Sequence, residues 1–201
     1  MKRIFLARKR SLAAAAVIIL ILGGIGAAYY VDINLPYWHF RTVEKDKFYR
    51  TSQLDGEQFR EAIDDYGIKT IVNLRDVAER TVRDKQGRDW YAEEQAAAKA
   101  KGIRLLDVPL RAGHPPSPEQ IQTLLSVMDD EKNLPVLIHC YHGSIRSAAL
   151  EGLWRREYMG EDGQRALRRV ESWGRDLQAD YPLIYEFIRD YVPRRKRGSK
   201  K

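Results

Sequence analysis

The sequence predicts an α/β fold: a three-layer α/β sandwich with a largely parallel central sheet of about four to five strands. Short apolar runs rich in β-branched residues alternate along the chain with longer segments whose apolar residues recur at helical spacing. An uncharged stretch, residues 12–31, precedes this alternating part. It adds one N-terminal transmembrane helix to the predicted architecture, because 20 residues suffice to cross a bilayer.

The N-terminal region has the organisation of a membrane anchor. Residues 1–11 carry five basic side chains and no acidic one. Basic residues before a span predict a cytoplasmic N-terminus, with the rest of the chain on the outer side, which is the periplasmic side if the source is bacterial. A cleaved signal peptide is the alternative, because Gly26-Ala27-Ala28 could serve as a cleavage site. The length of the apolar run, 12–31, favours an uncleaved anchor.

Beyond the anchor we expect a juxtamembrane linker at 32–43, a single domain at 44–192 and a basic disordered tail at 193–201. The net charge of +7 arises at the two ends of the chain, which hold eleven of its 35 Lys and Arg residues. The rest of the chain has 24 basic and 28 acidic residues. The domain is therefore mildly acidic, and no nucleic-acid partner is expected. The single cysteine excludes an intramolecular disulfide.

The first half of the domain shows two strands and two helices. Residues 48–54 are predicted as a strand, and Asp55 caps a helix that ends at Gly67. The next strand, 68–74, places Arg75 at its carboxyl end, where open α/β sheets bind ligands. Arg75 could add positive potential there, or it could form an ion pair with Asp76 or with a helix acid. An Ala-rich and Glu-rich helix follows at 89–101.

The second half continues the alternation. A strand is predicted at 103–110, and Ser117 begins a helix as a capping serine followed by proline and a capping-box glutamine. The last predicted strand precedes Cys140. Two more helices, near 161–173 and 179–192, close the domain.

The chain is organised around residues 135–148, PVLIHCYHGSIRSA. An apolar strand ends at His139 and Cys140, a loop containing Gly143 follows, and a helix begins at about Arg146. A loop that leads into a helix N-terminus binds a tetrahedral oxyanion without a metal, through backbone N–H groups and the helix dipole. The predicted phosphate-binding residues are Tyr141, His142, Gly143, Ser144, Ile145 and Arg146.

Cys140 lies at the floor of this loop. The helix dipole and the Arg146 guanidinium both favour its thiolate, which is a nucleophile. The alternative is that Cys140 is a small buried hydrophobic residue at the end of a strand. The coincidence of His139, Gly143 and Ser147 with the strand, loop and helix favours the catalytic interpretation.

The segment HCYHGSIRS resembles the H-C-x-x-G-x-x-R-S/T signature of cysteine-based protein tyrosine phosphatases, within the dual-specificity branch and its compact bacterial relatives. FYRTSQL (48–54), GIKTIVNLR (67–75) and VPLRAGHPPSPEQ (108–120) resemble further elements of that domain, and together these matches cover most of 44–192. The resemblance implies that Cys140 is the nucleophile, that Arg146 binds the phosphoryl group, and that Ser147 helps the thiolate leave in the second step. No cofactor and no metal site are expected.

The general acid is the weak point of the resemblance. Many of these phosphatases carry an aspartate in the loop before the Pro-Pro pair, where this chain has Ala112. Asp107, in the preceding strand, and His114, in the loop, are the candidate acids. His142 lies within the phosphate loop and could merely shape it. Alternatively, the substrate has a good leaving group and no strong acid is needed.

The predicted function is therefore a phosphatase that hydrolyses phosphate monoesters through a phosphocysteine, of the protein-tyrosine or dual-specificity type. Inositol polyphosphates and phospholipid headgroups are alternative substrates for the same mechanism. The expected partners are a phosphorylated protein, inositol or lipid, and a membrane bound through residues 12–31. The non-enzymatic alternative, motivated by Ala112, is a membrane-tethered phosphate-binding pseudophosphatase. Retention of Cys140, Arg146 and Ser147 favours an enzyme, because binding alone requires no thiol.

Overall fold

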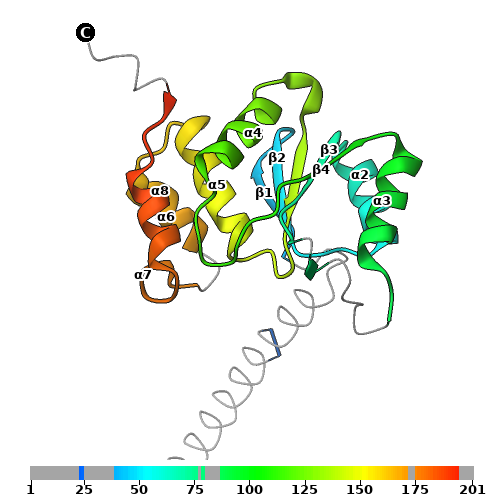
Figure 1. Ribbon diagram of the computed structural model, residues 1–201, viewed down its shortest axis with the longest axis horizontal. Coiled ribbons are helices and arrows are strands. Elements are labelled where there is room, and N and C mark those ends of the chain that lie inside the picture. The colour runs from blue at the N-terminus through cyan, green and yellow to red at the C-terminus, as the bar shows by residue number, and fades with distance from the viewer. Residues whose placement is uncertain (1–22, 25–38, 77, 80–86, 172–174, 195–201) are drawn as a thin grey trace, which may run out of the picture. The chain divides into compact units, whose positions relative to one another are not determined.

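The computed structural model describes residues 23–24, 39–76, 78–79, 87–171 and 175–194 (Figure 1). Apart from Gly23 and Gly24, the predicted membrane span at 12–31 lies outside these residues, as does the linker before residue 39. Within the described residues, every helix is too short or too polar to cross a bilayer. The fold below is that of residues 39–194.

The centre of the domain is a five-stranded sheet with the order β1-β2-β5-β3-β4. β1 pairs antiparallel with β2, whereas β2, β5, β3 and β4 run parallel to one another. The predicted sheet of four to five largely parallel strands is thus confirmed. The strands are β1 Arg41–Glu44, β2 Phe48–Thr51, β3 Thr70–Asn73, β4 Arg104–Asp107 and β5 Val136–His139.

Helices cover both faces of the sheet (Figure 1). One face carries two helices, and the other carries four longer helices together with the short helix α7, which confirms the three-layer arrangement. The first pair is α2 Gly56–Tyr66 and α3 Trp90–Lys101; the opposite layer contains α4 Pro118–Met128, α5 Arg146–Glu157, α6 Gly163–Glu171, α7 Leu177–Asp180 and α8 Pro182–Asp190.

The predicted helix ends follow local capping chemistry. The Asp55 carboxylate accepts hydrogen bonds from two backbone N–H groups at the start of α2, and Ser117 and Gln120 complete a capping box at the start of α4. Gly67 and Gly102 end α2 and α3 with φ of 60° and 65°, a left-handed conformation that glycine adopts without a steric penalty. These boundaries were predictable because each depends on a few adjacent residues.

Two parts of the domain differ from the prediction. Residues 41–43, expected in the linker, form most of β1, an edge strand too short to show an alternating apolar pattern. The single helix expected at 179–192 is instead divided into α7 and α8. Pro182 lies at the start of α8, where its missing N–H group and its ring favour a new helix over continuation of the preceding one.

The predicted disordered tail also begins too early. Arg194 donates hydrogen bonds of 2.7 and 2.8 Å to the two carboxylate oxygens of Asp129, and one of 2.6 Å to Glu157. This residue therefore belongs to the folded domain. The rest of the predicted tail, 195–201, lies outside the described residues.

Helix α5 occupies the middle of its layer. Eleven of its twelve residues are buried, so this helix has almost no solvent-facing side. Trp154 stacks on Phe48 of β2 with ring centroids 4.6 Å apart, which joins the helix to the sheet. The buried α5 is thus a rigid support for the loop at its N-terminus.

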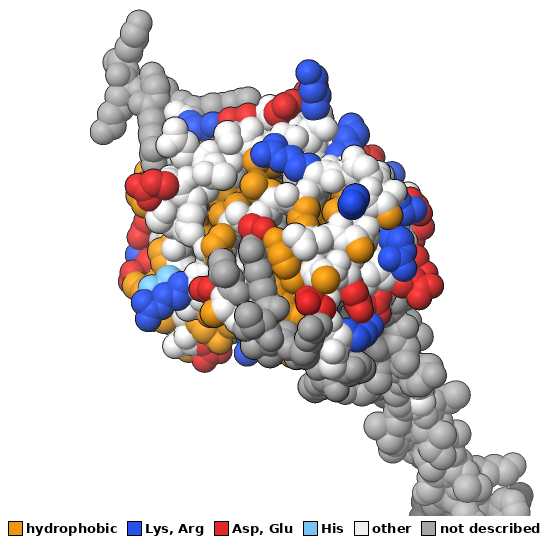
Figure 2. All heavy atoms as spheres, turned by 45° about the vertical axis from the view of Figure 1, so that its right-hand side comes forward, with side chains coloured by type: hydrophobic (Ala, Val, Ile, Leu, Met, Phe, Trp, Pro, Cys, Tyr) orange, Lys and Arg blue, Asp and Glu red, His pale blue; other side chains and the backbone are white. Residues whose placement is uncertain are grey.

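The surface of the domain differs from this buried helix in composition. On the face seen in Figure 2, basic and acidic side chains are intermixed with apolar ones.

Candidate active site

The candidate site is the loop 140–145, at the carboxyl edge of the sheet. Strand β5 lies in the middle of the sheet and ends at His139, while α5 begins at Arg146. Thr51 of β2 and Asn73 of β3 are both in register with His139, so the ends of the neighbouring parallel strands flank the loop. This edge is where open α/β sheets place ligands.

Gly143 fits the loop only because it has no side chain. Its φ is +67°, and a Cβ atom there would lie 2.6 Å from the backbone nitrogen of Ser52 and 2.7 Å from the carbonyl oxygen of Thr51. The Arg50 Nε also donates a 3.1 Å hydrogen bond to the Gly143 carbonyl oxygen. The loop is therefore held tightly against the end of β2.

Neighbouring residues bind two further carbonyl groups of the loop. The Gln53 backbone N–H donates to the Tyr141 oxygen at 3.1 Å, and the His39 ring donates to the His142 oxygen at 2.6 Å. The cap position of α5, Ile145, provides no side-chain hydrogen bond to the helix N-terminus. The first N–H groups of α5 are thus left without side-chain capping, as an anion-binding helix N-terminus requires.

Cys140 and Ser147 meet at the base of the loop. Cys140 is 2 % exposed, and its Sγ lies 3.7 Å from the Oγ of Ser147 in the first turn of α5. A hydroxyl at this position can hydrogen-bond to the sulfur when negative charge develops on it. The structure therefore brings together two of the residues for which the sequence predicted catalytic roles.

Arg146 is paired with a carboxylate that was not predicted as part of the site. Its two terminal nitrogens lie 2.5 and 3.4 Å from the Glu79 carboxylate oxygens, and one of them also donates to the Leu74 carbonyl at 3.4 Å. Arg75 donates to the same carboxylate at 3.0 Å. Burial alone would raise the pKa of Glu79, but the hydrogen bonds from Arg146 and Arg75 lower it below its usual value. Glu79 thus occupies the planar fork that a phosphoryl group would use.

The pairing leads to a prediction for Glu79→Gln. Because a phosphate dianion must share Arg146 with the Glu79 carboxylate, removing this negative charge should lower the inhibition constant of inorganic phosphate by about three- to tenfold. The measurement is competitive inhibition by phosphate, with Glu57→Gln on the exposed first turn of α2 as the control. Weaker phosphate binding in Glu79→Gln would show instead that this carboxylate serves to orient Arg146.

Arg75 is buried beside the loop, one residue beyond Leu74 at the carboxyl end of β3. Its guanidinium stacks 3.4 Å from the Trp90 ring centroid and lies 5.1 Å from that of Tyr141 in the loop. It also forms an ion pair, with Glu79 and not with Asp76. Tyr141 is 45 % exposed, so the loop presents an aromatic ring to solvent with the buried Arg75 guanidinium behind it.

His139, the residue before Cys140, is held by contacts with the helix layer formed by α2 and α3. Its Nε2 lies 2.8 Å from the Glu94 carboxylate of α3, and both side chains are fully buried. The Phe59 ring of α2 packs edge-on against the imidazole, with centroids 5.3 Å apart. Helices α2 and α3 therefore hold the end of β5 from one face while α5 holds the loop from the other.

A buried ionic cluster supports the loop from behind. Glu151, fully buried in the middle of α5, accepts from Arg41 at 3.3 Å, from Arg50 at 2.5 Å and from Arg155 at 2.8 Å. Because Arg50 also binds the Gly143 carbonyl, the cluster connects α5 to the loop through one guanidinium. Glu151 therefore positions the loop without belonging to it.

His142 lies on the basic side of the loop. Burial lowers the pKa of His142 below its usual value, and the nearby positive charge of Arg175 lowers it further. Both effects favour the neutral form of the ring. It stands edge-on to the Tyr141 ring, with centroids 4.6 Å apart.

The two candidate acids lie in different places. Both oxygens of Asp107 accept hydrogen bonds, from Asn73 at 2.9 Å and from Tyr91 at 2.5 Å. Asp107 ends β4, two strands from β5, which puts its Cα about 10 Å from that of His139. His114 lies in the loop after β4, with its Nδ1 3.2 Å from the Ala112 carbonyl oxygen. The fixed contacts of Asp107 suit a structural carboxylate better than a proton donor.

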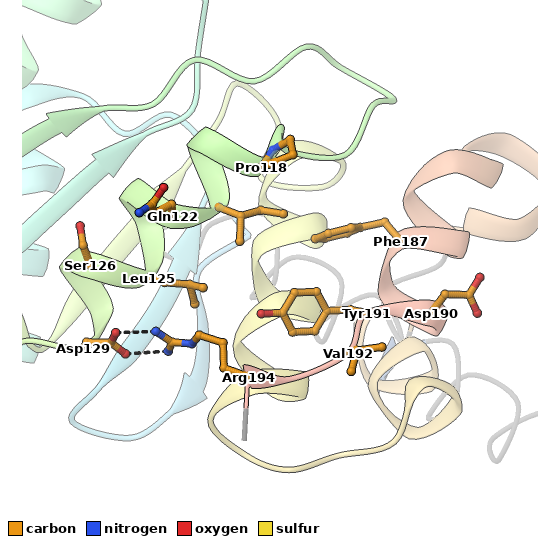
Figure 3. Close-up of a pocket in the computed structure, with 11 residues that line it drawn as sticks. Pro118, Gln122, Leu125, Ser126, Asp129, Phe187, Asp190, Tyr191, Val192 and Arg194 are labelled. Atoms are coloured by element: carbon orange, nitrogen blue, oxygen red, sulfur yellow. Dashed lines mark hydrogen bonds and ion pairs between the residues drawn. The ribbon is translucent and has the colours of Figure 1, made fainter. Parts of the chain in front are cut away.

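The domain also has a larger groove, of about 730 Å³, between α4 and the segment that includes α8 (Figure 3). Its apolar lining comes from Ile121, Leu125, Phe187 and Tyr191. The ion pair between Asp129 and Arg194 lies along the groove. None of the loop residues 140–145 is among the described residues that line this groove. Its size therefore does not identify it as the site of the chemistry.

Three carboxylates, those of Glu79, Glu94 and Glu151, are among the site residues that were not predicted from the sequence. Glu151 carried a usable signal, since it is the only charged residue in 148–154 and lies four residues before Arg155. Glu94 and Glu79 carried none, because a glutamate in a polar helix or a charged loop is typical of a solvated surface.

Similarity to known proteins agrees with this geometry. A family model described as "DSP-PTPase phosphatase fused to NAD+ Kinase" matches residues 39–179. The chain belongs to this phosphatase family. Membership places it in the cysteine-based protein tyrosine phosphatase superfamily, among cysteine-dependent phosphatases.

Individual relatives of this phosphatase are distant. The dual specificity protein phosphatase TpbA of Pseudomonas aeruginosa is 26% identical over 181 residues, which are 87% of this chain and 76% of TpbA. The probable chloroplastic NAD kinase 2 of Oryza sativa is 32% identical over 91 residues, 45% of this chain but only 9% of that relative's length. The core catalytic domain of the Saccharomyces cerevisiae PP-IP phosphatase SIW14 has the same fold, with a TM-score of 0.57 and 22% identity over 76% of this chain and 85% of that one.

Proposed function

We propose that the domain hydrolyses phosphate monoesters of the protein-tyrosine or dual-specificity type through a phosphocysteine formed on Cys140. The observation that carries this proposal is the arrangement of the loop. Cys140 Sγ lies 3.7 Å from Ser147 Oγ, beneath an α5 N-terminus without side-chain capping, and Arg146 is the first residue of that helix. These groups supply a nucleophile, an anion site and a hydrogen-bond donor to sulfur.

The reaction has two steps. The Cys140 thiolate attacks phosphorus, an S–P bond forms, and the ester P–O bond breaks as the alcohol oxygen departs. Arg146 and the α5 N–H groups bind the phosphoryl oxygens during this transfer, so Arg146 must share its fork with Glu79. Water then attacks phosphorus and the S–P bond breaks. Inorganic phosphate leaves, and the Ser147 hydroxyl stabilises the released thiolate.

Leaving-group dependence tests the activity and the acid together. Without a positioned acid, rates should fall steeply as the leaving-group pKa of a series of aryl phosphates rises, since negative charge develops on the departing oxygen. We expect this steep dependence in the wild type, and little change in Asp107→Asn because Asn73 and Tyr91 already hold this carboxylate. His114→Ala is the other variant to test, because His114 lies in the loop in which related phosphatases carry their acid.

Each outcome assigns the proton donor. A shallow wild-type dependence that becomes steep in Asp107→Asn would make Asp107 the acid, whereas the same change in His114→Ala would give this role to the imidazole. Absence of hydrolysis for every aryl phosphate would contradict the proposed activity itself.

The substrate class is the second part of the proposal. A TpbA structure contains pTyr, and SIW14 is named a PP-IP phosphatase, so phosphotyrosine and inositol phosphates are the two classes to compare. The basic residues near the loop, Arg175 and His39, favour inositol polyphosphates as the second candidate. Phosphate release from a phosphotyrosine peptide, an inositol polyphosphate and a phosphoinositide compares these two classes with phospholipid headgroups, which the phosphoinositide represents. The class with the highest kcat/KM is the substrate.

We further propose that residues 12–31 anchor the chain in a membrane, with the N-terminus in the cytoplasm and Cys140 on the outer side. The uncharged length of 12–31 and the basic residues before it support this topology. Protease added from the outer side should digest the domain while an N-terminal tag survives. Protection of the domain would contradict the orientation, and a mature protein without residues 1–28 would show a cleaved signal peptide.

A further inference from the structure

A second, smaller pocket lies against the middle of the phosphate loop. It encloses about 50 Å³ and is lined by residues from the start of the domain, from β1 and β2, from the loop and from the segment after α6. Its charged and polar side chains belong to His39, Arg41, Arg50, Ser144 and Arg175, and no carboxylate is among the described residues that line it. The walls are therefore positively charged.

The arginines on the inner wall already compete for one carboxylate. Arg41 and Arg50 are 8 % and 3 % exposed, and both donate to the same oxygen of Glu151, whose other oxygen binds Arg155. Burial, and next the positive charge of Arg50, lower the pKa of Arg41 to about 9. Buried cations are stable when anions offset their charge, so an additional anion at this wall would stabilise the cluster.

Ser144 adds a donor in the same place. Its Oγ is buried and has no hydrogen-bond partner among the described residues, which is costly for a hydroxyl group. A single water needs on the order of 10–15 Å³ of such space, so the pocket has room for several waters or for one tetrahedral oxyanion. A hydroxyl beside guanidinium groups is suited to phosphate or sulfate oxygens.

We propose that this pocket binds a second phosphate-like anion beside the phosphate loop, through Arg50, Arg175 and the Ser144 hydroxyl. Two sources share this chemistry: a further phosphoryl group of a multiply phosphorylated substrate, and free inorganic phosphate or sulfate. The substrate source rests on the proposed function, whereas binding of a free anion does not.

Arg175 can be substituted without disturbing the buried core of the domain. It is exposed, unlike Arg41 and Arg50, and its charge acts on His142 of the loop. An anion bound beside Arg175 would offset that charge and raise the pKa of His142. The imidazole is therefore a reporter of occupancy, and the chain has only four histidines to assign by NMR.

The binding arm of the test uses the full-length wild type, Arg175→Gln and the control Arg168→Gln, which removes the same charge from an exposed position of α6 that does not line the pocket. Calorimetric titration with inorganic sulfate should give two sites per chain in the wild type and in Arg168→Gln. In Arg175→Gln the second dissociation constant should rise about tenfold or more, as expected for loss of a charge-assisted contact. The rise in the His142 pKa on sulfate binding should shrink in parallel.

The kinetic arm distinguishes the sources. If the second anion belongs to the substrate, Arg175→Gln should raise KM about tenfold for phytate, which carries neighbouring phosphates, and leave KM for phenyl phosphate unchanged. If it is a free anion, both KM values stay unchanged while the second sulfate site weakens. One sulfate per chain in the wild type, or identical behaviour of Arg175→Gln and Arg168→Gln in both arms, would overturn the proposal. Sulfate binding needs no turnover, so failure of the proposed function would be seen separately, as absent hydrolysis of phenyl phosphate.

Discussion

Cys140→Ser is expected to abolish turnover, with a loss of at least about 10⁴-fold in kcat. The serine hydroxyl is a poor nucleophile without a base to remove its proton, and Cys140 is the only thiol in the chain. Binding of inorganic phosphate should persist, because Arg146 and the α5 N–H groups remain. The measurement pairs steady-state rates on an aryl phosphate with the phosphate dissociation constant of the same variant.

Folding must be separated from chemistry in this experiment. A serine replaces a buried sulfur by a slightly smaller polar atom, so the thermal unfolding midpoint of the variant should stay near that of the wild type. A variant that keeps its fold and a rate near the wild-type value would contradict the role of Cys140. Ser126→Ala, on the exposed side of α4, is a control for a change of similar size.

Glu151→Gln is expected to have the largest effect on stability. The variant keeps the shape of the side chain but leaves Arg41, Arg50 and Arg155 without the carboxylate that all three share. Loss of one partner from a buried ionic cluster typically lowers the free energy of unfolding by about 3–5 kcal/mol. Urea unfolding of wild type and variant measures the difference.

The same variant should also weaken catalysis, because Arg50 connects Glu151 to the Gly143 carbonyl of the loop. Glu186→Gln makes the same chemical change at an exposed position of α8 and should be nearly neutral. If Glu151→Gln and Glu186→Gln unfold at the same urea concentration, the cluster contributes nothing to stability. If their kcat values on an aryl phosphate are also equal, the positioning role of Glu151 is contradicted.

Local signals explain why most of the fold was predictable from sequence. The caps at Asp55 and Ser117 and the left-handed glycines at 67 and 102 depend on neighbouring residues, and β5 is a continuous apolar run. The strand, loop and helix around Cys140 are likewise adjacent in sequence. For these reasons the amino-acid pattern alone predicts both the phosphate loop and the parallel sheet.

What could not be predicted depends on contacts between distant residues. β1 exists because residues 41–44 pair with β2, and its own sequence lacks an alternating pattern. Glu79 contacts Arg146, which lies 67 positions later in the sequence, and Glu94 contacts His139, which lies 45 positions later. Asp107 and His114 both remained candidate acids, because the contacts of Asp107 with Tyr91 and Asn73 form only in the folded sheet.

Direct trapping of the phosphoenzyme tests the role of Cys140 most directly. The full-length Ser147→Ala variant is mixed with a radiolabelled aryl phosphate, quenched in milliseconds, digested and mapped by mass spectrometry. Since the Ser147 hydroxyl lies 3.7 Å from the sulfur and would assist its departure, its removal should slow the second step and let the intermediate accumulate. We predict a phosphoryl group on Cys140, formed in a burst that precedes steady turnover. Label on another residue, or turnover with no labelled protein at any time, would contradict the phosphocysteine mechanism.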